Sequence, residues 1–219
     1  MGIALLFPVF FITVLFIFLN DFKNPFYTPL RMGKNMKPFK MIKFRSMTIG
    51  ADKSGVNSTS INDNRITNVG KIIRKFKLDE LSQLFNVLIG NMSLVGPRPQ
   101  IIDHVINEYS DEEKNLLTVK PGITDISSIV FSDEGDILKD SLDPNKDYNI
   151  LIRPWKSKLG ILYIENQSIL LDFYLILLTL LAIINKRLSL IFINKLLMNY
   201  KADSDLINIS KRDKKLIIG

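Results

Sequence analysis

The chain has 219 residues, 47% of them hydrophobic, and a formal net charge of +7. It contains no cysteine, which excludes disulfides, cysteine nucleophiles and thiolate zinc sites. His104 is the single histidine, so a histidine-based triad has one candidate and a multi-histidine metal site has none. The length fits one domain with a sizeable core, or a smaller domain with membrane-embedded segments.

The first apolar run, from Gly2 to Leu19, contains no charged residue. A helix that spans a bilayer needs about 20 such residues, and Pro8 removes a helix hydrogen bond and bends the chain. We therefore predict a membrane-associated, re-entrant helix over residues 1–20 with its break at Pro8; a buried core helix is the alternative. A signal peptide fits poorly, because no basic segment precedes the run and no small-residue cleavage site follows it.

The segment that follows is basic, with 13 Lys and Arg against 5 Asp and Glu between Asp21 and Glu80. This excess places that end of the apolar run on the cytoplasmic side of a membrane. It also suits an anionic partner, such as phospholipid head groups, a nucleotide or nucleic acid, and charge alone does not choose among them. The sequence holds no recognisable nucleic-acid-binding module, so we expect no nucleic-acid partner.

Periodicity predicts the next elements. Apolar and basic residues alternate from Phe39 to Met47, which indicates a half-buried strand. The polar stretch from Ala51 to Asn64 predicts a mobile loop. From Val69 to Ile89, apolar residues recur every three or four positions, which predicts an amphipathic helix that Gly90 ends. Ile101 to Thr118 is also expected to be helical.

The C-terminal half contains two further helical patterns. Asp143-Pro144 breaks the chain before a helical stretch that runs, with Pro154 near its middle, toward Ile164. The uncharged segment from Phe173 to Ile184 is too short to span a bilayer comfortably, so we expect it to lie in a membrane interface or to pack on the core.

Asp79 and Glu80 are adjacent carboxylates at the start of the apolar-striped helix. Neighbours on a helix point about 100° apart, so the two side chains can serve different partners at one site. One can attack a substrate or bind a metal while the other handles a proton. The structural alternative is that acidic residues are favoured in the first helical turn by the helix dipole.

Three basic clusters are candidates for phosphate binding. Arg98 lies between two prolines, which limits the entropy that it loses on binding, and its planar guanidinium suits phosphate oxygens. Lys43 and Arg45 are interleaved with apolar residues, and Lys120 and Thr124 flank a Pro-Gly turn. For each cluster the alternative is a solvated surface position.

Four stretches together resemble the bacterial sugar transferase family, the small monotopic phosphoglycosyl transferases. They are RMGKNMKPFKMIKFRSM, DNRITNVGKIIRKFKLDELSQLFNVLIGNMSLVGPRP, VKPGIT and DPNKDYNILIRPWKSKLGILYIENQSILLD, and they run in family order from Arg31 to Asp172. The agreement around DEL and VGPRP is the most specific part. Ser82, Asn91 and Asp125 depart from the usual family residues.

The resemblance implies an α/β or mixed fold that is mostly helical, with amphipathic helices at the membrane interface. The expected division is a membrane helix over residues 1–20, a cytoplasmic catalytic domain over residues 21–185, and a C-terminal extension of unknown role over residues 186–219. The expected location is the cytoplasmic face of the bacterial inner membrane.

The resemblance also implies a reaction. Asp79 would attack the β-phosphate of a UDP-sugar and hold the phospho-sugar until polyprenyl (undecaprenyl) phosphate accepts it, with Mg²⁺ bound at Asp79. Glu80 would act on protons or orient the acceptor, while the five candidates for phosphate binding would neutralise charge. The product would enter an exopolysaccharide, capsule or lipopolysaccharide pathway through downstream glycosyltransferases. The alternative is an inactive membrane-bound regulator of the same pathway.

Overall fold

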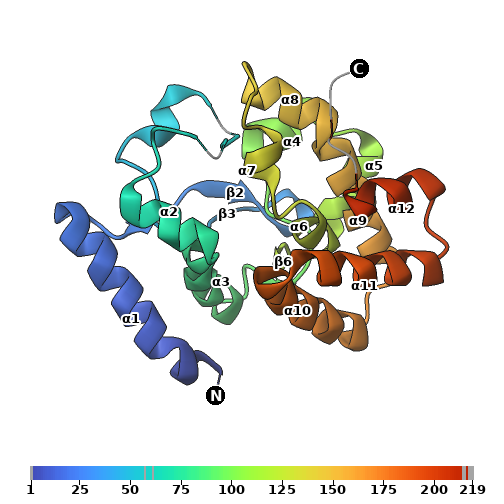
Figure 1. Ribbon diagram of the computed structural model, residues 1–219, viewed down its shortest axis with the longest axis horizontal. Helices are drawn as coiled ribbons and strands as arrows, with labels where there is room; N and C mark the ends of the chain where they lie inside the picture. The colour runs from blue at the N-terminus through green and yellow to red at the C-terminus, as the bar shows by residue number, and fades with distance from the viewer. Residues whose placement is uncertain (1, 57, 61, 214–215, 217–219) are drawn as a thin grey trace.

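The computed structural model describes residues 2–56, 58–60, 62–213 and 216. Within them the chain is mostly helical, with three two-stranded sheets (Figure 1), so the prediction of a mixed, mainly helical fold is confirmed. The α-helices are α1 (Gly2–Asp21), α2 (Asn68–Lys75), α3 (Leu84–Leu88), α4 (Ile102–Glu108), α5 (Asp111–Lys114), α6 (Ile126–Val130), α7 (Glu134–Ile137), α8 (Pro144–Leu151), α9 (Arg153–Glu165), α10 (Ile169–Ile184), α11 (Lys186–Asn199) and α12 (Ser204–Lys211). The strands are β1 (Phe26–Tyr27), β2 (Leu30–Met32), β3 (Pro38–Lys40), β4 (Lys43–Phe44), β5 (Ser93–Val95) and β6 (Gly122–Thr124), and the 3-10 helices are η1 (Lys34–Met36), η2 (Ala51–Ser54), η3 (Leu78–Gln83) and η4 (Asn115–Thr118).

The sheets are small and pair segments that lie apart in the sequence. β1 pairs antiparallel with β4, β2 pairs antiparallel with β3, and β5 pairs parallel with β6. The single strand predicted from Phe39 to Met47 is wrong, because β3 and β4 are separate strands. Between them the buried Asn86 side chain donates to the Lys40 carbonyl and accepts from the Ile42 amide, both at 2.8 Å, and so replaces ladder hydrogen bonds.

The N-terminal helix α1 continues through Pro8, so the predicted break at Pro8 is not present. Only six helical residues precede this proline, so the lost hydrogen bond lies close to the end of the helix. One face of α1 packs on the domain through Phe10, whose ring centroid lies 4.8 Å from that of Phe44 and 5.3 Å from that of Phe85. In the described part of the chain, no helix combines the length and apolar character that crossing a membrane requires.

The long helix predicted from Val69 to Ile89 is interrupted, which decides where the two carboxylates lie. α2 ends at Lys75, and Lys77 adopts a left-handed backbone with φ 53° that a continuous helix does not allow. The chain then restarts as η3, which the Ser82 hydroxyl ties to the Ile42 carbonyl at 3.2 Å. The helix predicted from Ile101 to Thr118 is likewise split, because Ser110 forms a capping box that starts α5.

The main hydrophobic core lies among α6, α9, α10, α11 and α12 (Figure 1). Ile126, Leu159, Leu175 and Ile193 are fully buried there. The described residues after position 186 therefore belong to the same core as the helices before it, and the expected boundary at residue 185 does not separate two packing units. Asp125 caps α6 by accepting from the Ser128 amide.

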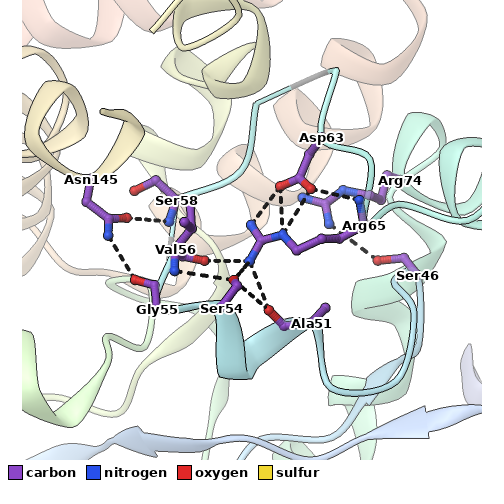
Figure 2. A network of polar contacts seen from close by, with 10 residues as sticks. All are labelled: Ser46, Ala51, Ser54, Gly55, Val56, Ser58, Asp63, Arg65, Arg74 and Asn145. Carbon is purple, nitrogen blue, oxygen red and sulfur yellow. Dashed lines mark hydrogen bonds and ion pairs between the residues drawn. The ribbon is translucent and has the colours of Figure 1, made fainter. Parts of the chain in front are cut away.

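The polar loop between β4 and α2 is held by side chains, although we predicted it to be mobile; its residues 57 and 61 lie outside the described residues (Figure 2). The Arg65 guanidinium binds Asp63, the Ala51 and Val56 carbonyls and the Ser54 hydroxyl. Asn145 of α8 accepts from the Ser58 amide and donates to the Gly55 carbonyl, which are contacts across the domain. Arg74 of α2 donates to the Ser46 hydroxyl at 3.4 Å beside this network.

Candidate active site

Asp79 and Glu80 lie in the first turn of η3, immediately after the left-handed Lys77. Both carboxylate side chains are 14% exposed. The Lys43 ammonium, from β4, lies 3.8 Å from a carboxylate oxygen of Asp79 and 3.6 Å from one of Glu80. Arg98 Nη2 lies 2.7 Å from the same Glu80 oxygen. The structure thus brings together four of the residues that the sequence predicted for the site.

Arg98 reaches the carboxylates because the parallel strands β5 and β6 fix the turn that carries it. A Cβ added to Gly122 would lie 2.1 Å from the Gly96 nitrogen, so the two backbones approach more closely than any side chain permits. Pro97 and Pro99, on either side of Arg98, are both buried. The Arg98 side chain itself is 34% exposed, so part of its guanidinium remains accessible to a ligand.

The charges around the pair favour an anionic ligand. Burial alone would raise the pKa of Glu80, but Arg98, Lys43 and Lys77 outweigh it and hold the pKa well below its usual value. The Glu80 carboxylate raises the pKa of the Arg98 guanidinium. Burial lowers the pKa of the ammonium groups of Lys43 and Lys77, partly offset by the carboxylates. Three cations thus surround two carboxylates, which leaves net positive charge for phosphate oxygens.

A second ion pair lies near Arg98, and the sequence analysis missed it. Lys156 of α9 pairs with Glu134 of α7, and its ammonium lies 5.3 Å above the ring of Tyr148. Arg98 and Lys156 both line a small cavity with Tyr109 and Tyr148. Lys156 lies within one of the family-like stretches, so the sequence offered a signal for it. Glu134 lies in none of them, and only the fold reveals it.

Arg45 does not lie at the carboxylate pair, which corrects the expectation that it accompanies Lys43. β4 ends at Phe44, so the two-residue alternation does not carry Arg45 to the face of Lys43. Its guanidinium instead makes two hydrogen bonds of 2.6 Å to Asp21 and a third, of 2.7 Å, to the Asn24 carbonyl. Arg45 is 7% exposed and ties the end of α1 to the domain.

Lys120 and Thr124 make their described contacts with groups other than the two carboxylates. The buried Thr124 hydroxyl shares a 2.7 Å hydrogen bond with Thr179 of α10. Lys120 is exposed, and its ammonium is close to Gly90 at the end of α3. Among the described residues, no ion pair links Lys120 to Asp79 or Glu80. The fold places both residues on the β5–β6 side of the site.

The donor set for a divalent metal consists of the two carboxylates. The described part of the chain contains no cluster of three or more His, Asp and Glu side chains able to enclose a metal ion. Mg²⁺ typically keeps several waters and binds through one or two carboxylates together with substrate phosphates. Asp79 suits this role, since its ion pair with Lys43 is longer than a hydrogen bond, whereas Glu80 is engaged by Arg98.

An acidic pair held among cations suits a site for phosphoryl transfer. Comparison with known proteins agrees: the family model described as Bacterial sugar transferase matches residues 1–186, and the chain belongs to this family. It is similar to a UDP-glucose:undecaprenyl-phosphate glucose-1-phosphate transferase of Klebsiella pneumoniae, with 39% identity over 160 residues, which cover 70% of this chain and 31% of that protein.

Two further relatives extend the comparison. An uncharacterized sugar transferase of Bacillus subtilis is 35% identical over 154 residues, covering 70% of this chain and 67% of that protein. A UDP-N-acetylgalactosamine-undecaprenyl-phosphate N-acetylgalactosaminephosphotransferase of Aeromonas hydrophila is 36% identical over 138 residues, covering 62% of this chain and 32% of that protein. The chain therefore matches about a third of the Klebsiella and Aeromonas proteins.

Proposed function

We propose that the chain transfers a sugar-1-phosphate from a UDP-sugar to a polyprenyl phosphate, probed best with undecaprenyl phosphate. The observation that carries this proposal is the Asp79–Glu80 pair, with Lys43 within 3.8 Å of both carboxylates and Arg98 at 2.7 Å from Glu80. The names of the Klebsiella and Aeromonas relatives describe this class of reaction. A basic, carboxylate-containing site suits a diphosphate substrate whose charge must be neutralised before attack.

Asp79 is the proposed nucleophile. One of its oxygens forms a bond to the β-phosphorus of the UDP-sugar, the bond from that phosphorus to the bridging oxygen breaks, and UMP leaves with the electron pair. A phosphate oxygen of the polyprenyl phosphate then attacks the same phosphorus and displaces Asp79. The products are UMP and polyprenyl-diphosphate-sugar. Both attacking oxygens are anionic, so neither step requires an added proton.

Glu80 positions cations in this mechanism. Its lowered pKa keeps it ionised at neutral pH, which disfavours the proton-donating role that the sequence left open. An ionised Glu80 holds Arg98 and Lys43 beside the attacking carboxylate. Arg98 and Lys43 are then preorganised to meet the phosphate oxygens, so little reorganisation is needed when charge develops.

Mg²⁺ is the proposed cofactor, bound by Asp79 together with the substrate phosphates. When bound, it would neutralise diphosphate charge and reduce the repulsion that an anionic nucleophile meets. Lys43 and Arg98 would share this task from the protein side.

We also propose that the chain acts at the cytoplasmic face of the bacterial inner membrane. Phe7, Phe11 and Phe16 of α1 are each at least 60% exposed, and the basic segment follows the helix directly. Exposed aromatic residues beside cations suit an anionic lipid surface. A membrane location follows chemically as well, because a polyprenyl acceptor stays in the bilayer, and downstream glycosyltransferases of a surface-glycan pathway would use the product there.

The test is incubation of the full chain with Mg²⁺, undecaprenyl phosphate and a panel of UDP-sugars, scored by UMP release. We expect release with at least one sugar and none with Asp79→Asn. Absence of release with every sugar, together with pathway effects of the intact protein in cells, would favour the alternative of an inactive regulator.

A further inference from the structure

Two cavities are each lined by a cation that acts on Glu80, Arg98 in the first and Lys77 in the second, and they differ in character. The first, described above, is lined by Arg98, two tyrosines and other polar groups. The second lies between the end of α2 and the helices α6 and α10, with an empty volume of about 480 Å³ that includes open solvent. It is lined by Lys75, Lys77, Ser128, Ile129, Ser132, Thr179, Ala182 and Ile183. We call it the α2–α10 cleft.

The α2–α10 cleft is cationic at one end. Lys75 and Lys77 line it, and no acidic residue is found among its described lining residues. Lys77 directly precedes the catalytic turn, and its charge contributes to the lowered pKa of Glu80, so the cleft opens beside the carboxylate pair. The Ser128 hydroxyl is buried and has no hydrogen-bond partner in the described structure, which leaves a donor for an incoming anion.

The α10 wall of the cleft is mostly apolar, with Thr179 beside two aliphatic residues. Ala182 and Ile183 come from α10, and Ile183 is 44% exposed. An exposed apolar stripe continues from there along α10, at the spacing of one helix face, through Leu180, Leu177 and Phe173.

From these features we infer that the α2–α10 cleft binds the phosphate head group and first prenyl units of the lipid acceptor. This inference rests on the proposed function and adds the acceptor subsite to it. The head group would meet Lys77, Lys75 and the Ser128 hydroxyl, and the prenyl chain would lie on the α10 stripe. The aliphatic side chains of Ala182 and Ile183 suit a prenyl chain better than a nucleotide base, which needs polar partners.

The variants that test this subsite remove either a positive charge or an apolar contact, without disturbing the backbone. Lys77→Asn removes the cation but keeps a residue that tolerates the left-handed backbone. Lys75→Gln removes the second cation, and Ile183→Gln removes the apolar contact. Lys71→Gln, also on α2 and exposed, is the matched control for loss of one positive charge outside the cleft.

The first measurement is steady-state kinetics with donor and acceptor varied separately. We expect Lys75→Gln/Ile183→Gln to raise the acceptor KM at least about tenfold, with the donor KM changed less than about twofold, while Lys71→Gln changes neither beyond about twofold. Lys77→Asn, which also removes a cation beside the carboxylates, is expected to raise both KM values. A larger effect on the donor KM than on the acceptor KM would overturn the inference and assign the cleft to the nucleotide. An unchanged acceptor KM would also overturn it.

The second measurement is direct binding of farnesyl phosphate to the full chain, with inorganic phosphate as the head-group probe. We expect farnesyl phosphate to bind at least about tenfold more tightly than inorganic phosphate, and Ile183→Gln to weaken only farnesyl phosphate binding. Equal binding of the two probes would show a bare anion site and overturn the lipid assignment. This measurement stands even if no UDP-sugar releases UMP, so a failed proposed function and a failed subsite remain distinguishable.

Discussion

Among the residues of the site, Arg98 is the one that is both held in place and still exposed enough to bind a phosphate. It is fixed between two buried prolines, paired with Glu80 at 2.7 Å and still 34% exposed. We predict that Arg98→Ala lowers kcat/KM for the UDP-sugar at least about tenfold, which corresponds to roughly 1.4 kcal/mol. Lys34→Ala, in an exposed turn, serves as the matched control and should change kcat/KM little. Equal losses in the two variants would argue against a special role for Arg98.

The ionisation of Glu80 makes the free energy of unfolding depend on pH. Its folded pKa lies below the ordinary value of 4.5, because three cations outweigh the effect of burial. Its contribution to the free energy of unfolding is therefore fully present above about pH 4.5 and is lost as the pH falls through the folded pKa. Urea unfolding at about pH 7 and about pH 3.5 should show a larger loss for the wild-type chain than for Glu80→Gln. Parallel losses would contradict the pairing of Glu80 with its cations.

Site residues that share a local motif are predictable from the sequence, whereas residues whose partners come from distant segments are not. Asp79, Glu80 and Arg98 lie in one family-like stretch, and the fold does bring them together with Lys43. Arg45 was misplaced because its partner, Asp21, is 24 positions away at the end of another element. Nothing in a single sequence states that an interleaved basic residue turns inward to an ion pair.

At the scale of elements, the break at Lys77 decides where Asp79 and Glu80 lie, because it separates η3 from α2. The apolar spacing from Val69 to Ile89 is real, but spacing does not reveal a residue that takes a left-handed backbone, and so the predicted helix was too long. The paired strands were also missed in detail, since Asn86 replaces ladder bonds between β3 and β4. Turns of this kind depend on tertiary contacts that a sequence pattern does not contain.

The contact between the end of α1 and the segment after β4 should stabilise the fold. Arg45 anchors the C-terminal end of α1 through two hydrogen bonds to Asp21. We predict that Arg45→Met lowers the free energy of unfolding by about 2 kcal/mol, the usual range for charged hydrogen bonds. Lys40→Met on β3, where the side chain is exposed, is the control and should cost far less in urea unfolding. A selective loss of donor binding with unchanged stability would instead restore Arg45 to the phosphate site.

For the whole molecule, the last helices complete the core. Ile193 and Leu197 of α11 are fully buried, and Asp133 pairs with both Lys186 and Arg212. We predict that a chain ending at residue 185 loses cooperative unfolding, because its α6–α10 core would be left open to water. A chain ending at residue 216, which keeps α12, Arg212 and the core contact of Leu216, should unfold like the full chain in circular dichroism. Cooperative unfolding of the shorter chain would show that the C-terminal helices are dispensable.

The proposed reaction turns on one covalent bond between Asp79 and the phospho-sugar. The direct measurement is mass spectrometry of the full chain after incubation with Mg²⁺ and a UDP-sugar that supports UMP release, without acceptor. We predict one sugar-phosphate per chain on the peptide containing Asp79, released when polyprenyl phosphate is added, and no adduct in Asp79→Asn. Turnover by Asp79→Asn at a rate near wild type, or an adduct on a different residue, would contradict this mechanism.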